Sequence, residues 1–313
     1  MDRLAAMQAF IRVADEGSFT VAAERLAVSK SVVSKQIQAL ERHLGVRLFN
    51  RSTRQLHLTE PGIRFYERAS RIIEDLADAE RTVGDLQARP RGRLCINVPV
   101  SFALGHLSPA LPEFLARYPE LSVDVTLGDR FVDLVEEGYD LSIRISALED
   151  SSLIARRIAP CESWVCASPD YLDRHGRPDH PRELATHHGL IYAYARPPRE
   201  WQLTAPDGTV HRVPVTGRVR INNGEMLVDA ARAGVGIIVT PDFIAYRAVR
   251  AGELVRLFPD HRGPELAIHA VYPYTRHVPA KVRAFIDFLL ERFGDGAPPW
   301  AWTRLTRESR ESR

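Results

Sequence analysis

The segment spanning residues 17–58 constrains the fold of this 313-residue chain more than any other. Ser18 supplies a side-chain oxygen that can begin a helix, and apolar residues then recur at helical spacing. After a bend around Val28, Ser29 can cap a second helix and Gly45 can end it. The segment therefore predicts two helices joined by a tight corner.

The second of these helices has two faces of opposite character. Its apolar residues fall at steps of four, three and four: Val33, Ile37, Leu40 and Leu44. The other face carries hydrogen-bonding side chains, two of them cationic and none acidic: Lys30, Ser31, Ser34, Lys35 and Gln38. Base edges in the major groove offer donors and acceptors, and phosphates line its rims. The pattern predicts a helix that lies in the major groove and reads bases with these five side chains.

A basic segment follows the second helix. Apolar and polar side chains alternate over residues 47–58 and predict a two-stranded wing that turns at residues 52–54. Between Val28 and Leu58 the chain carries six Lys or Arg and the single acid Glu41, whereas its overall net charge is only +2. A solvated helix face with incidental cations is the alternative, but the corner, the apolar register and the wing agree with one another. The side chains predicted to contact phosphates are Thr20, Arg47, Arg51 and Arg54.

Residues 5–62 resemble the amino-terminal winged helix-turn-helix of the LysR-type transcriptional regulators. The resemblance is carried by Phe10, Ala14, GSFT, AAERL, VSKSVVSKQI, ALE, LG, RLFNR and LTEPG. It continues more loosely through the rest of the chain, where YPYTRHVPAKVRAFIDFLLERF is the most typical piece. It implies a ligand-responsive regulator that binds double-stranded DNA at an inverted repeat, as a dimer or tetramer, with a small-molecule effector and no cofactor.

A long helix with a heptad seam is predicted after the wing. The seam residues are Phe65, Ala69, Ile72, Leu76, Ala79, Val83 and Leu86. Over residues 62–88 such a helix extends about 40 Å at 1.5 Å per residue, and its seam requires a partner. The seam could dock on its own chain, whereas the resemblance implies a linker helix that pairs with another subunit. Pro90 and Gly92 break the helix and mark a hinge.

The remaining two thirds of the chain have the pattern of an α/β domain. From Arg93 onward, short apolar runs alternate with helical patterns, which predicts a parallel sheet. The resemblance implies two lobes with the fold of periplasmic type 2 solute-binding proteins, so the fold class is α/β with a helical winged head. The predicted domains are residues 1–60 for the head, 61–90 for the linker, and 91–295 for the effector domain, followed by a loose tail over 296–313. Within the effector domain, lobe 1 comprises residues 91–161 and 265–295, and lobe 2 comprises residues 162–264.

An effector site is predicted where the carboxyl ends of the strands meet, because ligands of open parallel sheets bind there. The residues at these ends are Ser101, Phe102, Gly128, Asp129, Arg144 and Ser146 in lobe 1, and Asn222, Asn223 and Thr240 in lobe 2. We expect a small organic anion there, with Arg144 as its charge partner. Each of these residues could instead be a helix cap or a strand-end turn, and Arg144 could face solvent or pair with Asp140.

Composition narrows the class of protein. The chain is 45% apolar and 26% charged, as in ordinary globular proteins. Charged residues near the amino terminus are incompatible with a signal peptide, and no apolar run reaches the roughly twenty residues of a membrane span. Three cysteines, an odd number, indicate free thiols in a reducing compartment. We expect a cytoplasmic protein that does not bind membranes.

Two other classes of function are alternatives. A thiol-based redox sensor would act through Cys161 and Cys166 beside the expected hinge, but buried apolar cysteines explain the same pattern. An α/β enzyme tethered to DNA would need a catalytic or metal motif, and the chain has no G-x-x-x-x-G-K-[ST], H-E-x-x-H, C-x-x-C or G-x-S-x-G. We therefore expect no catalytic residues and no metal site.

Overall fold

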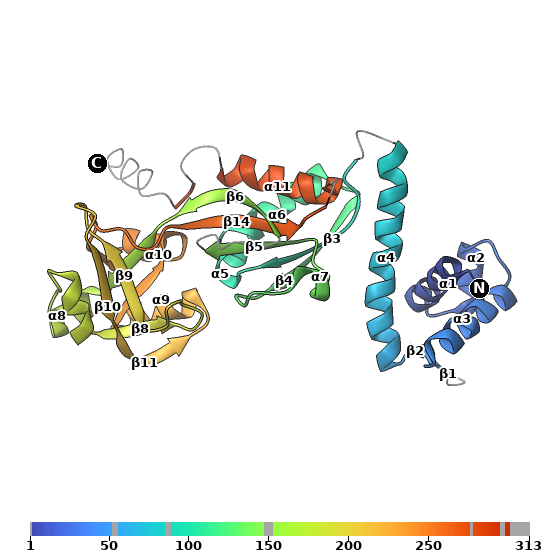
Figure 1. The fold of residues 1–313 in the computed structure, drawn as a ribbon, viewed down its shortest axis with the longest axis horizontal. Helices are drawn as coiled ribbons and strands as arrows, with labels where there is room; N and C mark the ends of the chain where they lie inside the picture. The colour runs from blue at the N-terminus through green and yellow to red at the C-terminus, as the bar shows by residue number, and fades with distance from the viewer. Residues whose placement is uncertain are drawn as a thin grey trace. The chain divides into compact units, whose positions relative to one another are not determined.

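The computed structural model describes residues 2–51, 56–84, 89–146, 153–275, 278–294 and 298–300. The chain divides into two compact units, Met1–Arg89 and Pro90–Arg313, which are both drawn in Figure 1. None of the described helices is long and apolar enough to span a membrane.

The first unit is a winged helix-turn-helix followed by a long helix. Its elements are α1 (Arg3–Glu16), α2 (Phe19–Arg25), α3 (Lys30–Leu44), β1 (Phe49–Arg51), β2 (Leu56–Leu58) and α4 (Glu60–Gly84). The predicted caps are confirmed, because the hydroxyls of Ser18 and Ser29 accept hydrogen bonds from backbone N–H groups three residues later. Gly45 ends α3 in the left-handed conformation. The wing pairs β1 with β2 in antiparallel register.

The corner between α2 and α3 is tight enough to require an unusual backbone. Ala27 has a φ of 53°, in the left-handed region that normally favours glycine. A hydrogen bond from the Val28 N–H to the Ala23 carbonyl, 3.0 Å long, closes the turn. The predicted apolar face of α3 is buried at Val33, Ile37 and Leu40. These contacts fix the direction in which the polar face of α3 points.

The core of the first unit joins the helices to the wing. The Phe10 ring of α1 lies 5.2 Å from the Phe49 ring of β1 and 5.3 Å from the Phe65 ring of α4. Gly62 is required where α4 crosses the chain entering the wing, because a Cβ there would lie 2.1 Å from the Leu48 carbonyl oxygen. The start of α4 is therefore fixed to the unit formed by α1, α2, α3 and the wing.

The predicted heptad seam is divided by this packing. Phe65 packs against the core of the first unit, as in the alternative of docking on the same chain, and Ala69 is fully buried. Ile72, the next seam residue, is 50% exposed. Ala79 and Val83 lie in α4, and Leu86 lies outside the described residues. The early part of the seam thus serves the head, and the surface available to a partner helix begins at Ile72.

Lobe 1 of the second unit is an α/β layer. Its elements are β3 (Gly92–Val98), α5 (Val100–Phe102), the π-helical turn η1 (Ala103–Leu107), α6 (Ser108–Arg117), β4 (Leu121–Leu127), α7 (Leu134–Glu137), β5 (Leu141–Ser146), β6 (Leu153–Cys161), β14 (Leu266–Pro273) and α11 (Ala280–Phe293). The strand order is β4-β3-β5-β14-β6. The sheet is mixed, because β14 runs antiparallel to both neighbours. The expectation of a purely parallel sheet is therefore wrong at β14.

Lobe 2 has a second sheet and a hairpin. Its elements are β7 (Ser163–Ala167), α8 (Pro169–His175), the 3-10 helix η2 (Pro181–Thr186), β8 (His188–Tyr192), β9 (Glu200–Thr204), β10 (Val210–Pro214), β11 (Thr216–Ile221), α9 (Gly224–Arg232), β12 (Ile237–Pro241), α10 (Asp242–Arg250) and β13 (Val255–Leu257). The five-stranded sheet has the order β11-β8-β12-β7-β13, and β9 pairs with β10. The chain crosses between lobes after β6 and again between β13 and β14 (Figure 1).

The C-terminal segment contributes to the core of lobe 1. Trp300 is fully buried, and its ring centroid lies 4.5 Å from that of His106 and 5.7 Å from that of Phe293. Its indole N–H donates to the carbonyl of Pro160 over 3.4 Å. The expectation of a loose tail from residue 296 is therefore wrong at Trp300, and residues 301–313 lie outside the described part of the chain.

Candidate DNA-binding surface and effector site

The polar face of α3 is open to solvent along its length. The side chains of Lys30, Ser31, Lys35 and Gln38 are exposed and that of Ser34 is half-buried. The hydroxyls of Ser29 and Ser31 are hydrogen-bonded to each other at 2.8 Å, which orders the first turn. The surface combines cations with short and long hydrogen-bonding groups. Such a set can contact both phosphates and base edges.

An apolar side chain on the same helix was not predicted. Val32 lies in the first turn of α3 and is 39% exposed. Apolar side chains in a major groove contact the thymine methyl group. The sequence offered a signal, because Val32 lies outside the four-three-four register of the buried residues.

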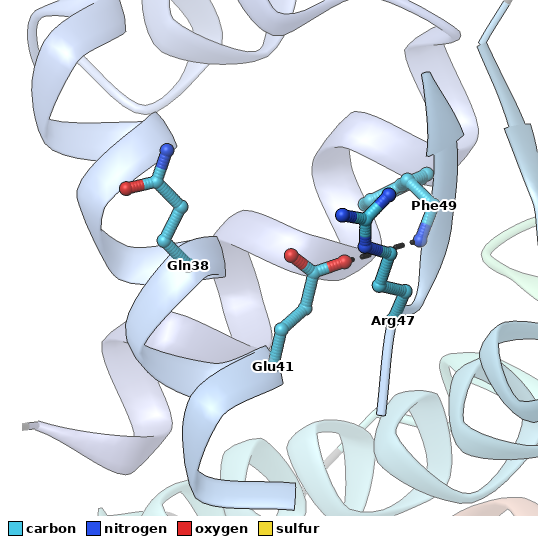
Figure 2. A pocket seen from close by; sticks show the side chains of 4 residues that line it. All are labelled: Gln38, Glu41, Arg47 and Phe49. Atoms are coloured by element: carbon cyan, nitrogen blue, oxygen red, sulfur yellow. Dashed lines mark hydrogen bonds between the residues drawn. The ribbon is translucent and has the colours of Figure 1, made fainter. Parts of the chain in front are cut away.

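The wing adds a basic side chain close to this helix. Arg47 is exposed just before β1 and lines a hollow of about 250 Å³ with Gln38, Glu41 and Phe49. Figure 2 shows Glu41 reaching from α3 to the backbone N–H of Phe49. Arg51 ends β1.

The remaining predicted phosphate contacts lie elsewhere. Thr20 is exposed in the first turn of α2. Arg54 and the side chain of Arg51 lie outside the described residues. The structure thus brings together Gln38 and Arg47 among the predicted DNA contacts.

In lobe 1, the predicted effector residues Ser101 and Asp129 lie at adjacent strand ends. The Val100 N–H donates a hydrogen bond to the Asp129 carboxylate over 3.1 Å, which links the ends of β3 and β4. Burial raises the pKa of Asp129, and this hydrogen bond partly offsets the effect. Ser101 is only 5% exposed, and its hydroxyl forms no hydrogen bond within the described chain. A buried hydroxyl of this kind lacks a partner that a ligand could provide.

In lobe 2, the predicted residues have different local roles. The Asn223 side chain caps α9 by accepting from the Met226 N–H over 3.0 Å, and the Asn222 amide donates to the Tyr194 hydroxyl over 3.4 Å. Thr240 is 2% exposed and, among the described atoms, its hydroxyl has no hydrogen-bond partner. Asn223 is therefore a helix cap, which was the alternative to an effector contact. Thr240 resembles Ser101, because its buried hydroxyl has no partner among the described atoms.

Two observations place Ser101 and Asp129 of lobe 1 close to residues of lobe 2. A Cβ added to Gly224, the first residue of α9, would lie 3.5 Å from the Ser101 hydroxyl oxygen. Tyr192 ends β8, and burial raises its pKa, with further contributions from Asp129 of lobe 1 and from Tyr194. The strand ends of the two lobes therefore face each other at Ser101, Asp129 and Tyr192. Tyr192 was missed in the sequence, although it ends an apolar run in the same way as the residues chosen.

Arg144 is half-buried, and its buried Nε has no hydrogen-bond partner among the described atoms. Its guanidinium lies 5.1 Å from the centre of the Phe131 ring and donates to the Val132 carbonyl over 2.9 Å. Burial lowers the pKa of Arg144. The suggested pairing with Asp140 is wrong, because Asp140 pairs with Lys281 at 2.8 Å. The Arg144 side chain therefore holds a segment of its own lobe.

The other predicted effector residues mainly support the fold. Phe102 is fully buried and contacts the rings of His106 and Phe243, so it belongs to the core rather than to a ligand surface. The Gly128 N–H donates to the Val98 carbonyl over 3.0 Å, which is a strand-end turn. Ser146 is half-buried at the end of β5.

The three cysteines differ in their burial. All three are free, Cys161 and Cys166 are buried, and Cys95 is half-buried. Burial raises the pKa of both buried thiols, that of Cys166 to about 12. Thiolates are the reactive form, so these settings disfavour oxidation. Among the described residues no group of three or more His, Cys, Asp or Glu could hold a metal ion.

Comparison with known families assigns both units. The family model for the LysR substrate binding domain matches residues 87–294. The model for the bacterial regulatory helix-turn-helix protein of the lysR family matches residues 4–63. The chain belongs to the LysR family of transcriptional regulators. This LysR-type regulator therefore combines a helix-turn-helix DNA-binding domain with an effector-binding domain.

Individual relatives agree with this assignment along nearly the whole chain. An uncharacterized HTH-type transcriptional regulator of Haemophilus influenzae is 39% identical over 282 residues, covering 90% of this chain and 98% of the relative. CrgA, a LysR-type regulator from Neisseria meningitidis, is 32% identical with a TM-score of 0.59, covering 93% and 99% of the two chains. The Vibrio cholerae virulence activator AphB is 32% identical with a TM-score of 0.58, covering 92% and 98%. LysR-type regulators bind DNA and small-molecule effectors and form oligomers.

Proposed function

We propose that this LysR-type regulator reads an inverted-repeat operator with two copies of α3, one from each subunit of a dimer or of a dimer within a tetramer. The observation that carries the proposal is the exposed polar face of α3, which holds two cations and no acid. One such helix contacts only a few base pairs, and two related by a twofold axis match two half-sites. The exposed Ile72 on α4 supports a partner helix along the linker.

Different side chains serve affinity and specificity in this proposal. Lys30, Ser31, Ser34, Lys35 and Gln38 reach base edges. Thr20, Arg47, Arg51 and Arg54 hold phosphates. Phosphate contacts strengthen binding to any duplex and make it depend on salt, whereas base contacts favour one sequence.

The first test compares one residue of each kind. We expect Lys35→Ala to weaken binding to the specific operator by about 1–3 kcal/mol while changing binding to random duplex much less. We expect Arg47→Ala to weaken both and to lower the slope of log K against log salt by about one. Fluorescence anisotropy titrations at several salt concentrations measure both quantities. Equal losses on both duplexes for Lys35→Ala would refute its base-reading role.

We further propose that a small organic anion binds between the lobes, against the hydroxyls of Ser101 and Thr240. The support is that both hydroxyls are buried and lack partners within the described chain, because buried polar groups are normally hydrogen-bonded. A carboxylate accepts from hydroxyl groups, so it can be held there without Arg144. The anion regulates by binding one arrangement of the protein on DNA more tightly than the other.

The second test uses a panel of small carboxylates and their neutral amides. We expect at least one carboxylate, but not its amide, to raise the Tm of the wild-type protein, since ligand binding stabilises the folded state. Replacing both hydroxyls, with Ser101→Ala and Thr240→Val, should remove the shift. Ser122→Ala, an exposed hydroxyl on β4, is the matched control. A shift that survives loss of both hydroxyls would place the ligand elsewhere, and equal shifts with amides would exclude an anion.

The thiol-sensing alternative has less support. Cys161 and Cys166 are buried with raised pKa values, so neither is poised for oxidation.

A further inference from the structure

Glu41 is an acid in a place where an acid should weaken DNA binding. It is the single acid between Val28 and Leu58, a stretch with six Lys or Arg. It lies one turn after Gln38 on α3 and beside Arg47, both of which line the same hollow. A negative charge close to a phosphate backbone is repelled by it. The presence of Glu41 therefore calls for a compensating role.

The carboxylate of Glu41 is bound to the backbone of the wing. One of its oxygens accepts from the Leu48 N–H over 2.8 Å and from the Phe49 N–H over 3.3 Å. Figure 2 shows the side chain crossing from α3 to the strand. Hydrogen bonds to an ionised acceptor are the stronger class. They join the helix that reads bases to the first strand of the wing.

The backbone around Arg47 is held by Thr59 and by the burial of the residues that follow it. The Thr59 hydroxyl donates to the Arg47 carbonyl over 2.7 Å, and the Thr59 N–H donates to the Leu48 carbonyl over 2.9 Å. Leu48 and Phe49, which follow, are buried in the core of the first unit. Glu41 holds the N–H groups of the same short segment. The backbone that carries Arg47 is thus fixed, while its side chain is exposed.

We infer that Glu41 is a positioning residue for DNA binding, which holds Arg47 at a fixed distance from the base-reading residue Gln38. The inference rests on the proposed phosphate contact of Arg47. Loss of the Glu41 hydrogen bonds removes one of the attachments of the segment before β1, so that Arg47 is held less firmly and must be ordered when it meets its phosphate. A contact that must first be ordered contributes less to affinity.

The sign of the change in DNA affinity on removing Glu41 distinguishes a positioning role from simple charge repulsion of DNA. Removing an acid near DNA should by itself strengthen binding, and Glu24→Ala, an exposed acid on α2, measures that effect. We expect Glu41→Ala to weaken binding of the full-length protein to its operator by about tenfold, and Glu41→Gln, which keeps an acceptor oxygen, to recover most of the loss. Operator fragments selected from genomic DNA by the wild-type protein serve as the probe.

A double-mutant cycle with Arg47→Ala provides the decisive readout. In the wild-type background Arg47→Ala should cost about tenfold in affinity and lower the salt slope by about one. In the Glu41→Ala background it should cost less than about threefold and leave the slope nearly unchanged. Circular dichroism at the titration temperature shows whether each variant is folded, and a variant that melts early is titrated at lower temperature.

The outcomes distinguish this inference from the proposed function. If Arg47→Ala alone has no effect, the phosphate contact itself is wrong. If Arg47→Ala weakens binding but Glu41→Ala binds as tightly as the wild type, or if the two losses multiply independently, then Glu41 does not position Arg47.

Discussion

Asp242 is a buried carboxyl group whose charge changes near neutral pH. It is the first residue of α10 and lies where the chain crosses between the lobes, since its N–H donates to the Glu162 carbonyl over 2.8 Å. Its side chain accepts from the Phe243 N–H over 2.8 Å. Burial raises the pKa of Asp242 from 3.8 to about 7, against the lowering effect of hydrogen bonds that its carboxyl group accepts from the backbone N–H groups of Glu162 and Phe243.

Stability should therefore depend on pH through this residue. Because its pKa is higher in the folded state, folding favours the protonated form, and ionisation of Asp242 destabilises the protein as pH rises from about 4 to about 7. The slope is at most about 1.4 kcal/mol per pH unit. Asp242→Asn should remove this contribution, so the variant gains stability relative to the wild type as pH rises. Urea unfolding of both proteins between pH 4 and pH 8 measures the difference, and a difference independent of pH would contradict the raised pKa.

At the scale of single residues, the exposure of side chains could be predicted from the sequence, but their hydrogen-bonding and packing partners could not. The exposure of Lys35 and Gln38 follows from the register of the buried face of α3. The contacts of Arg144 could not be predicted, because its partners Phe131 and Val132 come from a loop that no pattern within its own strand indicates. The sequence shows Glu41 only as an isolated acid, because its role as a hydrogen-bond acceptor for the Leu48 N–H depends on where the wing folds back.

At the scale of elements, local sequence signals predicted the ends of helices correctly but not the direction in which strands pair. The corner before α3 and the ends of its helices follow from Ser18, Ser29 and Gly45, which act on adjacent backbone. The direction of β14 does not follow from adjacent residues, because its strand partners β5 and β6 lie more than a hundred residues away in the sequence. Non-local contacts also explain Trp300, whose place in the core depends on His106 and Pro160, far from it in the sequence.

Trp300 provides a stability prediction for the C-terminal segment. Its ring fills space between His106 and Phe293 with no exposed area. Trp300→Ala should lower the free energy of unfolding by about 3–5 kcal/mol, because such truncations leave a cavity in the core. Tyr274→Ala, at a residue that is 75% exposed, should change it by less than about 0.5 kcal/mol. Urea denaturation of the two variants tests this, and a small loss for Trp300→Ala would show that the segment is dispensable.

At the scale of the whole molecule, function depends on joining two units with different tasks. The head presents α3 on a unit that includes α4, and the second unit brings the strand ends of its lobes together at Ser101 and Tyr192. Both units could be recognised from the sequence, since their motifs are local. The partner of α4 could not be predicted, since the seam residue Phe65 packs against the core of the head and Ala69 is fully buried.

Selection from a randomised duplex library by the purified full-length protein tests the central claim most directly. Two copies of α3 on a symmetric dimer should enrich an inverted repeat whose half-site centres lie about 10–10.5 base pairs apart or a multiple of that spacing. Enrichment of that dyad is the predicted result. Enrichment of a single asymmetric half-site, or of no sequence at low salt, would contradict the account.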